Sequence, residues 1–347
     1  MCRTLDECRW LYNRLLEERV LSYEACDVSV GVYDQINRTV TLKAERPALK
    51  AVHSQVLQNV AVRLDLAYKA FFRRVKTGET PGFPRFRGKG RYDSFCYPGS
   101  GHKVDGQRVV LSKIGPVPAV IHRPLEGAGK TCCVRRTATG KWYVSFSCDV
   151  AAEVLPATDA VVGIDVGLAS FATFSSGEHI ENPRFFRRDE KALARVQRRM
   201  SLHETFSPAW RKRKKAVAHV HERIADRRRD FAHQHSRRIV NQYGVVAVED
   251  LSINAMVHNH CLAKSISDAA WGQFTTYLQY KAEDAGRSYV AVSPAYTSQE
   301  CSRCHHRQKL TLADRVYRCP CCGLELDRDH NAALNIVALG LESLASA

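Results

Sequence analysis

Four cysteines in the last quarter of the chain have the spacing of a metal-binding motif. Cys301 and Cys304 form one C-x2-C pair, and Cys319 and Cys322 form a second pair after fourteen intervening residues. Each pair directs two thiolates at one point, and four thiolates complete the tetrahedral shell that suits Zn²⁺. Such a shell is coordinatively closed, so the sequence predicts one structural zinc ion. Cys321 lies inside the second pair at the wrong spacing, and we interpret it as a spare thiol.

Five acidic residues lie next to this motif or at the ends of apolar segments. Asp165 lies in the run AVVGIDVG, Glu249 and Asp250 end the run GVVAVED, and Asp327 and Asp329 begin the stretch DRDHNAALNI. Each acid alone has a structural explanation. It could be a hydrogen-bonded core carboxylate, the start of a loop, or a helix N-cap followed by an acid that the helix dipole favours.

Taken together, these acids predict a cation site. Burying a carboxylate such as Asp165 is costly unless the group is paired or bound to a metal. Several converging carboxylates repel one another, and Mg²⁺ or Mn²⁺, which prefer oxygen ligands, relieve that repulsion. Two such ions about 4 Å apart are a common device for phosphodiester hydrolysis: one prepares the attacking water and the other stabilises the leaving oxygen.

The charge of the chain favours a polyanionic partner. Lys and Arg number 52 against 36 Asp and Glu, which gives a formal net charge of +16. Residues 184–241 contain 18 basic and 6 acidic residues, a surplus of 12. One such arginine is well explained by a solvated helix face, but so many like charges repel one another unless a polyanion lies against them. The candidate phosphate contacts of this segment are Lys212, Arg213, Arg227, Arg228 and Arg229.

A second basic segment, GFPRFRGKGRYDSFCYP, interleaves basic and aromatic residues. Its candidate nucleic-acid contacts are Arg85, Arg87, Lys89 and Arg91. The aromatic side chains either stack on nucleotides or form the core of a β-rich module, and the sequence leaves both possibilities open. These residues are Phe83, Phe86, Tyr92, Phe95 and Tyr97.

The elements that must position these residues follow from apolar periodicity and from breaker residues. Apolar stripes predict helices over 3–24 and 47–76, followed by a β-rich segment over 92–150 with a hairpin turn before Lys141. After a linker, we expect strands over 160–167, 168–175, 244–250 and 288–294. The remaining helices are expected over 184–241, with a break near Ser207 and Pro208, over 267–285, and over 328–340.

The amino-terminal residues MCRTLDECRWLYN are polar and charged, unlike a secretory signal peptide. The sequence also has no window of ~20 apolar residues that could span a membrane. We therefore expect a reducing, cytoplasmic compartment, in which the paired cysteines among the 13 present serve as metal ligands and not as disulfides.

The order of these features resembles the TnpB family, whose members are encoded by insertion sequences and are related to type V CRISPR effectors. In both, an aspartate-bearing strand, a basic helical insertion, a glutamate-bearing strand, a zinc knuckle and an aspartate-bearing helix follow one another. The matching stretches are GIDVG, VVAVEDL, TSQECSRC, RCPCCG and DRDHNAALNI, with CRWLYN and GFPRFRGKGRYDSFCYP in the amino-terminal half. The resemblance extends over nearly the whole chain.

The resemblance implies an α/β fold: an RNase H-like (RuvC) nuclease core with a zinc-ribbon insertion, preceded by a β-barrel-like wedge module with an inserted helical recognition bundle. The expected domains are 1–152 for the wedge and recognition module and 153–300 for the first part of the nuclease. The zinc ribbon is expected over 301–322, and the last nuclease motif and helix over 323–347. Family members usually begin with a β-strand before the first helix, and its absence here indicates an incorrectly assigned start or a truncated copy.

The resemblance also implies roles for individual acids. Asp165, Glu249 and Asp329 match the family's catalytic residues, which would hold Mg²⁺ or Mn²⁺, with two ions expected. Asp250 would alternate to the other face of its strand, and Asp327 is left as a helix cap. The implied activity is RNA-guided DNA cleavage in a prokaryotic cytoplasm, at the nucleoid. The partners would be a guide RNA from the end of the element and double-stranded target DNA with a short adjacent motif.

Two other functions compete with this hypothesis. A decayed or truncated copy could act as a nucleic-acid-binding regulator of transposition without cleaving, although the presence of all three acids favours an enzyme. A transposase that joins DNA strands itself is a further alternative, but no tyrosine or histidine constellation in the sequence supports it.

Overall fold

The computed structural model describes residues 1–127, 129–311 and 313–346. The chain divides into two compact units, Met1–Val150 and Ala151–Ala347, and each is described by itself. Among the described residues, no helix combines the length and the hydrophobicity that crossing a membrane requires.

Unit 1 begins with helices. The predicted first helix is confirmed as α1 (Cys2–Cys26), and its predicted apolar face is buried at Cys8, Leu11, Leu15 and Leu16. The helix expected over 47–76 is two elements, a 3-10 helix η1 (Pro47–Ala51) and α3 (Ser54–Lys76), because Val52 between them is extended. A further helix, α2 (Val32–Glu45), was not predicted.

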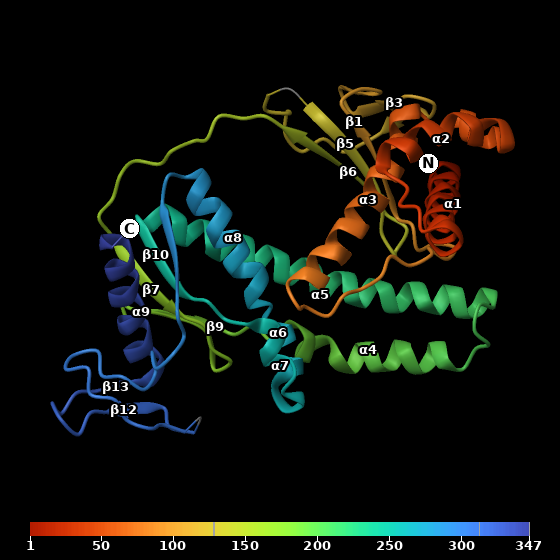
Figure 1. Ribbon diagram of the computed structural model, residues 1–347. Helices are drawn as coiled ribbons and strands as arrows, with labels where there is room; N and C mark the ends of the chain where they lie inside the picture. The colour runs from red at the N-terminus through yellow and green to blue at the C-terminus, as the bar shows by residue number, and fades with distance from the viewer. Residues whose placement is uncertain (128, 312, 347) are drawn as a thin grey trace. The chain divides into compact units, whose positions relative to one another are not determined.

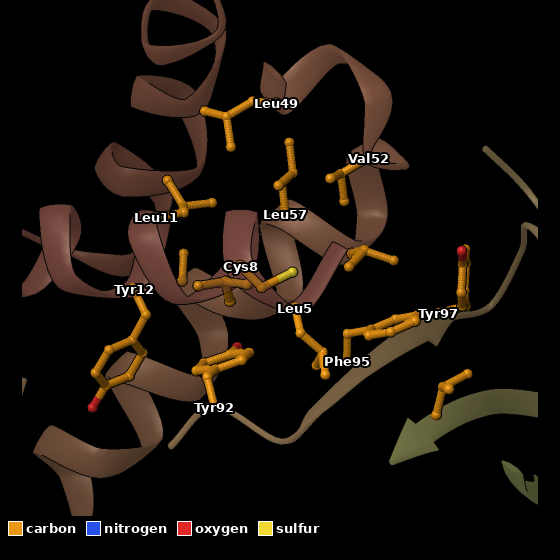
Figure 2. Packing of buried hydrophobic residues seen from close by; sticks show 14 of the residues in the cluster. Leu5, Cys8, Leu11, Tyr12, Leu49, Val52, Leu57, Tyr92, Phe95 and Tyr97 are labelled. Atoms are coloured by element: carbon orange, nitrogen blue, oxygen red, sulfur yellow. The ribbon is translucent and has the colours of Figure 1, made fainter. Parts of the chain in front are cut away.

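The core of unit 1 lies between these helices and the strand that follows them. Figure 2 shows Leu5, Cys8, Leu57, Tyr92 and Phe95 among the packed side chains, and these five residues belong to one buried cluster. Tyr97 belongs to the same cluster, so three of the five aromatic residues considered for nucleotide stacking are core residues instead. The other two, Phe83 and Phe86, are exposed by 49% and 59%.

Two antiparallel sheets of three strands complete unit 1. One has the order β1-β5-β6, and the other has the order β2-β3-β4. The predicted hairpin turn is confirmed between β5 and β6, where the amide of Thr137 donates to the carbonyl of Lys141 over 2.8 Å. The barrel-like description of this module stays a prediction. The strands are β1 (Ser94–Pro98), β2 (His102–Asp105), β3 (Arg108–Leu111), β4 (Gly115–Pro118), β5 (Gly129–Arg136) and β6 (Trp142–Cys148).

One cysteine pair corrects the expectation that paired cysteines are metal ligands and not disulfides. Cys96 on β1 and Cys133 on β5 are direct partners in the antiparallel register, and a disulfide joins them. Directly opposed residues of antiparallel strands direct their side chains to the same face of the sheet, which brings the two thiols together. The two cysteines are 37 residues apart in the sequence, a spacing that matches no recognisable motif.

Unit 2 is built on a mixed sheet of five strands in the order β11-β10-β7-β8-β9. The central strand β7 is parallel to β10, which is parallel to β11, whereas β8 and β9 are antiparallel to their neighbours. Four of these strands were predicted, and the short β9 was not. The strands are β7 (Val161–Asp165), β8 (Ser170–Phe174), β9 (His179–Glu181), β10 (Val245–Glu249) and β11 (Ser288–Val292).

Helices α4 (Phe185–Ser201) and α5 (Pro208–Gln242) form a long hairpin that extends from this sheet (Figure 1). The predicted break is confirmed: Ser207 caps α5 by accepting a hydrogen bond from the amide of Trp210, and Pro208 is its first residue. The helix expected over 267–285 is largely confirmed by α8 (Trp271–Asp284), but it is interrupted near its start. Ala270 has a left-handed conformation with φ 57°, which separates α7 (His260–Ala269) from α8. A short helix, α6 (Ile253–Met256), precedes them.

The last helix, α9 (Arg328–Ala345), packs on β7 and β10 (Figure 1). The approach is close at Gly163 of β7, because a Cβ atom there would lie 2.1 Å from the carbonyl oxygen of Ala333. Glycine is therefore required at this position. Between β11 and α9 the chain forms the cysteine-rich knuckle, which contains the two-stranded hairpin of β12 (Val316–Arg318) and β13 (Glu325–Asp327).

Candidate active site and metal centre

Two of the predicted acids lie side by side at one edge of the five-stranded sheet. Asp165 is the last residue of β7 and Glu249 is the last residue of β10. The two strands are parallel, and Val248 pairs with Ile164, so the residues that follow this pair are the two acids. The carboxyl edge of parallel strands is where open α/β sheets usually bind ligands.

The third acid comes from the first turn of α9. Asp329 is the second residue of that helix, and a Cβ atom at Gly167 would lie 3.7 Å from its Oδ2 atom. This places the Asp329 carboxylate against the loop that leaves β7 directly after Asp165. Asp327 has the predicted capping role: its Oδ1 atom accepts from the amides of Asp329, over 2.9 Å, and His330, over 3.1 Å.

The acids influence one another's protonation. Burial raises the pKa of Asp165 well above its ordinary value, and the nearby carboxylates of Glu249 and Asp329 raise it further. Burial also raises the pKa of Glu249, with a smaller contribution in the same direction from Asp329. The structure therefore brings together the three acids that the family resemblance selected. Each negative charge on one of them makes ionisation of the next more costly. Asp250, by contrast, is exposed.

Arg328 partly balances this negative charge. Its guanidinium donates to Asp329 Oδ1 through Nε, over 3.2 Å, and through Nη2, over 3.0 Å. Both side chains are largely buried, with exposed fractions of 14% and 15%. The same guanidinium lowers the pKa of Asp165, opposing the burial that raises it. Sequence reasoning had assigned Arg328 no role.

Thr297 makes a second contact that the sequence did not reveal. Its hydroxyl lies 2.5 Å from Glu249 Oε1 and donates to it, which lowers the pKa of Glu249 against the effect of burial. Thr297 is only 4% exposed. The contact therefore holds one oxygen of the Glu249 carboxylate, Oε1, in place.

Two asparagines of α9 hold the segment that contains Thr297. Asn335 Nδ2 donates to the carbonyls of Thr297 and Glu300, in both cases over 2.8 Å. One turn earlier, Asn331 accepts from the amide of Ser302 and donates to the carbonyl of Glu300. Both asparagines are buried. The helix that supplies Asp329 thus also anchors the entry to the knuckle and, through Thr297, the position of Glu249.

The knuckle brings the four predicted cysteines together. The Sγ atoms of Cys301, Cys304, Cys319 and Cys322 all lie within 4.8 Å of one another. Two of the separations are 3.6 Å and 3.5 Å, close to the roughly 3.8 Å edge of a tetrahedron of thiolates around zinc. Within the described ranges, no other group of three or more potential ligands is this tight. Cys321 is exposed and outside the group, as predicted.

The basic residues of the α4–α5 hairpin differ in their surroundings. Arg228 is 23% exposed and donates to the buried Asp268, whose carboxylate also accepts from the amides of Phe186 and Arg187 at the start of α4. Arg228 therefore holds the hairpin in place. Arg227 pairs with Asp189, and Arg229 with Asp226, whereas Lys212 and Arg213 are exposed.

In unit 1, the predicted basic residues Arg85, Arg87, Lys89 and Arg91 are exposed along the segment before β1. The amide of Arg87 donates to Asn13 Oδ1 over 2.7 Å, and Asn13 Nδ2 donates back to the carbonyl of Arg87. This pair of bonds fixes the backbone of the segment to α1. The nucleic-acid-binding role of these side chains stays a prediction.

Comparison with known proteins places this arrangement in a class. Residues 145–260 match a family described as "Probable transposase" (OrfB_IS605), and residues 271–336 match the "Cas12f1-like, TNB domain" family. The first match covers the strands that contain Asp165 and Glu249 with the hairpin between them, and the second covers the knuckle and the start of α9. The class is that of insertion-sequence proteins related to the Cas12f1 effectors.

Full-length similarity identifies the family within this class. The chain is 36% identical to a "Putative RNA-guided DNA endonuclease" of Streptomyces pristinaespiralis over 99% of its length and 86% of the relative's. It is 33% identical to the "Putative RNA-guided DNA endonuclease InsQ" of Escherichia coli (strain K12) over 99% of this chain and 89% of the relative. The chain belongs to the TnpB family. The fold also resembles a chain in the "Cas12f1-sgRNA-target DNA complex", with a TM-score of 0.59, 15% identity, and coverage of 97% of this chain and 81% of the other.

Proposed function

We propose that the protein is an RNA-guided, Mg²⁺-dependent DNA endonuclease encoded by a transposable element. The main support is the convergence of Asp165, Glu249 and Asp329 at one sheet edge, in a chain that matches relatives named as RNA-guided DNA endonucleases along nearly its whole length. A guide RNA from the end of the element pairs with one strand of the target DNA. The amino-terminal unit reads a short motif next to the target.

The three carboxylates are the groups that would hold the catalytic cations. Divalent ions bound there would supply an activated water and a stabilised leaving oxygen. Not all carboxylate oxygens need to lie within a few ångströms of one another, since Mg²⁺ keeps several water ligands and takes others from substrate phosphates. The sheet order β9-β8-β7-β10-β11, with β7 central, supports an RNase H-like (RuvC) core for this chemistry.

The remaining parts have supporting roles. The closed set of four thiolates suits a structural zinc, which would stabilise the knuckle that Asn331 and Asn335 connect to the acids. Exposed basic residues along the helices of the hairpin, away from its tip, would contact phosphates of the RNA–DNA duplex. Such contacts recognise the geometry of the duplex, while base pairing with the guide recognises the sequence.

A cleavage assay with reconstituted guide RNA tests the proposal. The wild type should cut a plasmid that contains the target and leave 5′-phosphates, with either Mg²⁺ or Mn²⁺. Asp165→Ala should abolish cleavage and change guide and target binding little, because the substitution leaves the basic surfaces intact. A wild type that binds guide and target and never cuts with either metal would make the non-cleaving regulator the better assignment.

A further inference from the structure

The loop between α4 and α5 exposes apolar side chains at the tip of the hairpin. Leu202 is 82% exposed and Phe206 is 69% exposed, and the loop connects the end of α4 at Ser201 with the start of α5 at Pro208. The two helices pack along each other, so the loop projects from the end of a long, supported element (Figure 1). The loop therefore presents two large apolar side chains to solvent at the end of the hairpin.

The local structure holds two aromatic rings at this tip. Phe206 has a left-handed backbone with φ 71°, which is disfavoured for a residue with a Cβ atom. Its ring centroid lies 5.5 Å from that of Trp210 at an angle of 55°. The Ser207 cap binds the amide of Trp210, and Lys214 Nζ lies 4.8 Å from the centre of the indole ring. Phe206 and Trp210 are called the aromatic tip below.

Five consecutive basic residues directly follow the aromatic tip. Residues 211–215 read RKRKK, and all five are exposed. Five residues exceed one helical turn, so these charges surround the first turns of α5 and do not form one stripe. An apolar protein partner would explain the rings but not this concentration of cations. A polyanion with accessible flat apolar groups explains both.

We propose that the aromatic tip stacks on an unpaired base of single-stranded DNA whose phosphates contact residues 211–215. Bases inside a duplex stack on one another and offer no free face, whereas an unpaired strand offers both bases and phosphates. The inference rests on the proposed function, because pairing of guide RNA with one target strand leaves the other DNA strand unpaired. That displaced strand is the occupant of the tip.

Binding of a short mixed-sequence DNA oligonucleotide containing 2-aminopurine tests the inference with the full chain. Phe206→Ala should weaken binding of the single strand by about 5- to 150-fold, the usual effect of losing one stacked base. It should also reduce the quenching of 2-aminopurine fluorescence. Phe206→Tyr keeps a ring and should bind as the wild type does, and Leu202→Ala is the matched control for loss of an apolar side chain in the same loop.

The salt dependence of binding distinguishes base stacking by the aromatic tip from phosphate contacts by the basic residues. Phe206→Ala should leave the dependence of the dissociation constant on salt unchanged, because it removes no phosphate contact. Lys212→Glu combined with Arg213→Glu should reduce the log–log slope, by about 0.7 for each phosphate contact that is lost. Duplex DNA of the same sequence should respond to the charge reversal and not to Phe206→Ala.

Several outcomes would overturn the inference. Unchanged binding of single-stranded DNA by Phe206→Ala would exclude stacking, and an equal loss in Leu202→Ala would indicate a general disturbance of the loop. A loss confined to RNA of the same sequence would mean that the guide, and not a DNA strand, occupies the tip. If the wild type never cuts DNA but Phe206→Ala still binds the single strand weakly, the stacking site stands and the proposed nuclease function fails.

Discussion

Replacing Thr297 by valine tests whether the segment that leads into the knuckle positions Glu249, one of the three proposed catalytic acids. The substitution keeps the volume of the side chain and the main-chain carbonyl to which Asn335 donates, and it removes the hydroxyl that lies 2.5 Å from Glu249 Oε1. A hydrogen bond to a charged acceptor contributes about 1.5–3 kcal/mol, and a buried carboxylate oxygen that loses its donor cannot recover it from solvent.

The expected effect is a weaker cation site in an otherwise intact protein. If the whole bond contributes to holding Glu249 in its ligating position, its loss corresponds to roughly 10- to 150-fold in affinity. Substitutions of residues that hold metal ligands typically cost about 10- to 100-fold. We therefore expect Thr297→Val to raise the Mg²⁺ concentration for half-maximal cleavage by about one to two orders of magnitude.

The measurements are Mg²⁺ titrations of cleavage and direct Mn²⁺ binding followed by electron paramagnetic resonance. Zinc content serves as the control for the fold, because Thr297→Val changes no thiolate and should retain one equivalent. Thr297→Ser keeps the hydroxyl and should restore most of the affinity. If serine and valine are equally impaired, the methyl group of Thr297 matters through packing and the positioning role is wrong. An unaltered Mg²⁺ titration in Thr297→Val would refute it directly.

Four further results are expected. Cys319→Ala should release the zinc and destabilise unit 2, and a full equivalent of zinc retained in metal analysis would contradict the four-thiolate site. Asp327→Ala should lower the free energy of unfolding by about 1 kcal/mol and leave substantial cleavage, whereas Asp329→Ala should not cleave. If Asp327→Ala is inactive and Asp329→Ala still cleaves, Asp327 is the cation ligand and Asp329 is not. Burial raises the pKa of Asp165 in the folded protein, so the wild type, kept free of divalent cations by a chelator, should lose stability as pH rises from the ordinary aspartate pKa to this raised pKa. Thermal melts over this pH range should show a smaller loss of stability in Asp165→Asn. Arg228→Ala should destabilise the start of α4 in hydrogen exchange, because it leaves Asp268 buried without its guanidinium; unchanged exchange there would show that the ion pair is dispensable.

The sequence allowed the acids and the cysteines to be selected because their signals are local. The cysteines have a fixed spacing, and five acids lie in or beside apolar runs or at the start of a helix; the family resemblance then chose Asp165, Glu249 and Asp329 among these five. Thr297 gave no such signal, because its partners Glu249 and Asn335 lie 48 and 38 residues away and only the fold brings them together. The buried asparagines Asn331 and Asn335 on α9 were the one sequence feature that pointed to such a contact.

The elements that were mispredicted have equally specific causes. The break between α7 and α8 lies at Ala270, whose left-handed conformation has neither glycine nor proline to indicate it. The disulfide joins cysteines whose pairing depends on the register of β1 and β5. Arg228 was selected for its charge, and its role in capping α4 depends on Asp268, 40 residues later in the chain.

The position of α9 has a consequence for biosynthesis. This helix covers β7 at Gly163, supplies Asp329 and anchors the knuckle, so the ribosome must synthesise it before the site is complete. A nascent chain, or a product of premature termination before α9, contains Asp165, Glu249 and the basic hairpin but lacks the third carboxylate. On the proposed function, such a fragment would keep the basic side chains of the hairpin but lack one of the three carboxylates proposed to hold the catalytic cations, so it could bind nucleic acid before it could cut it.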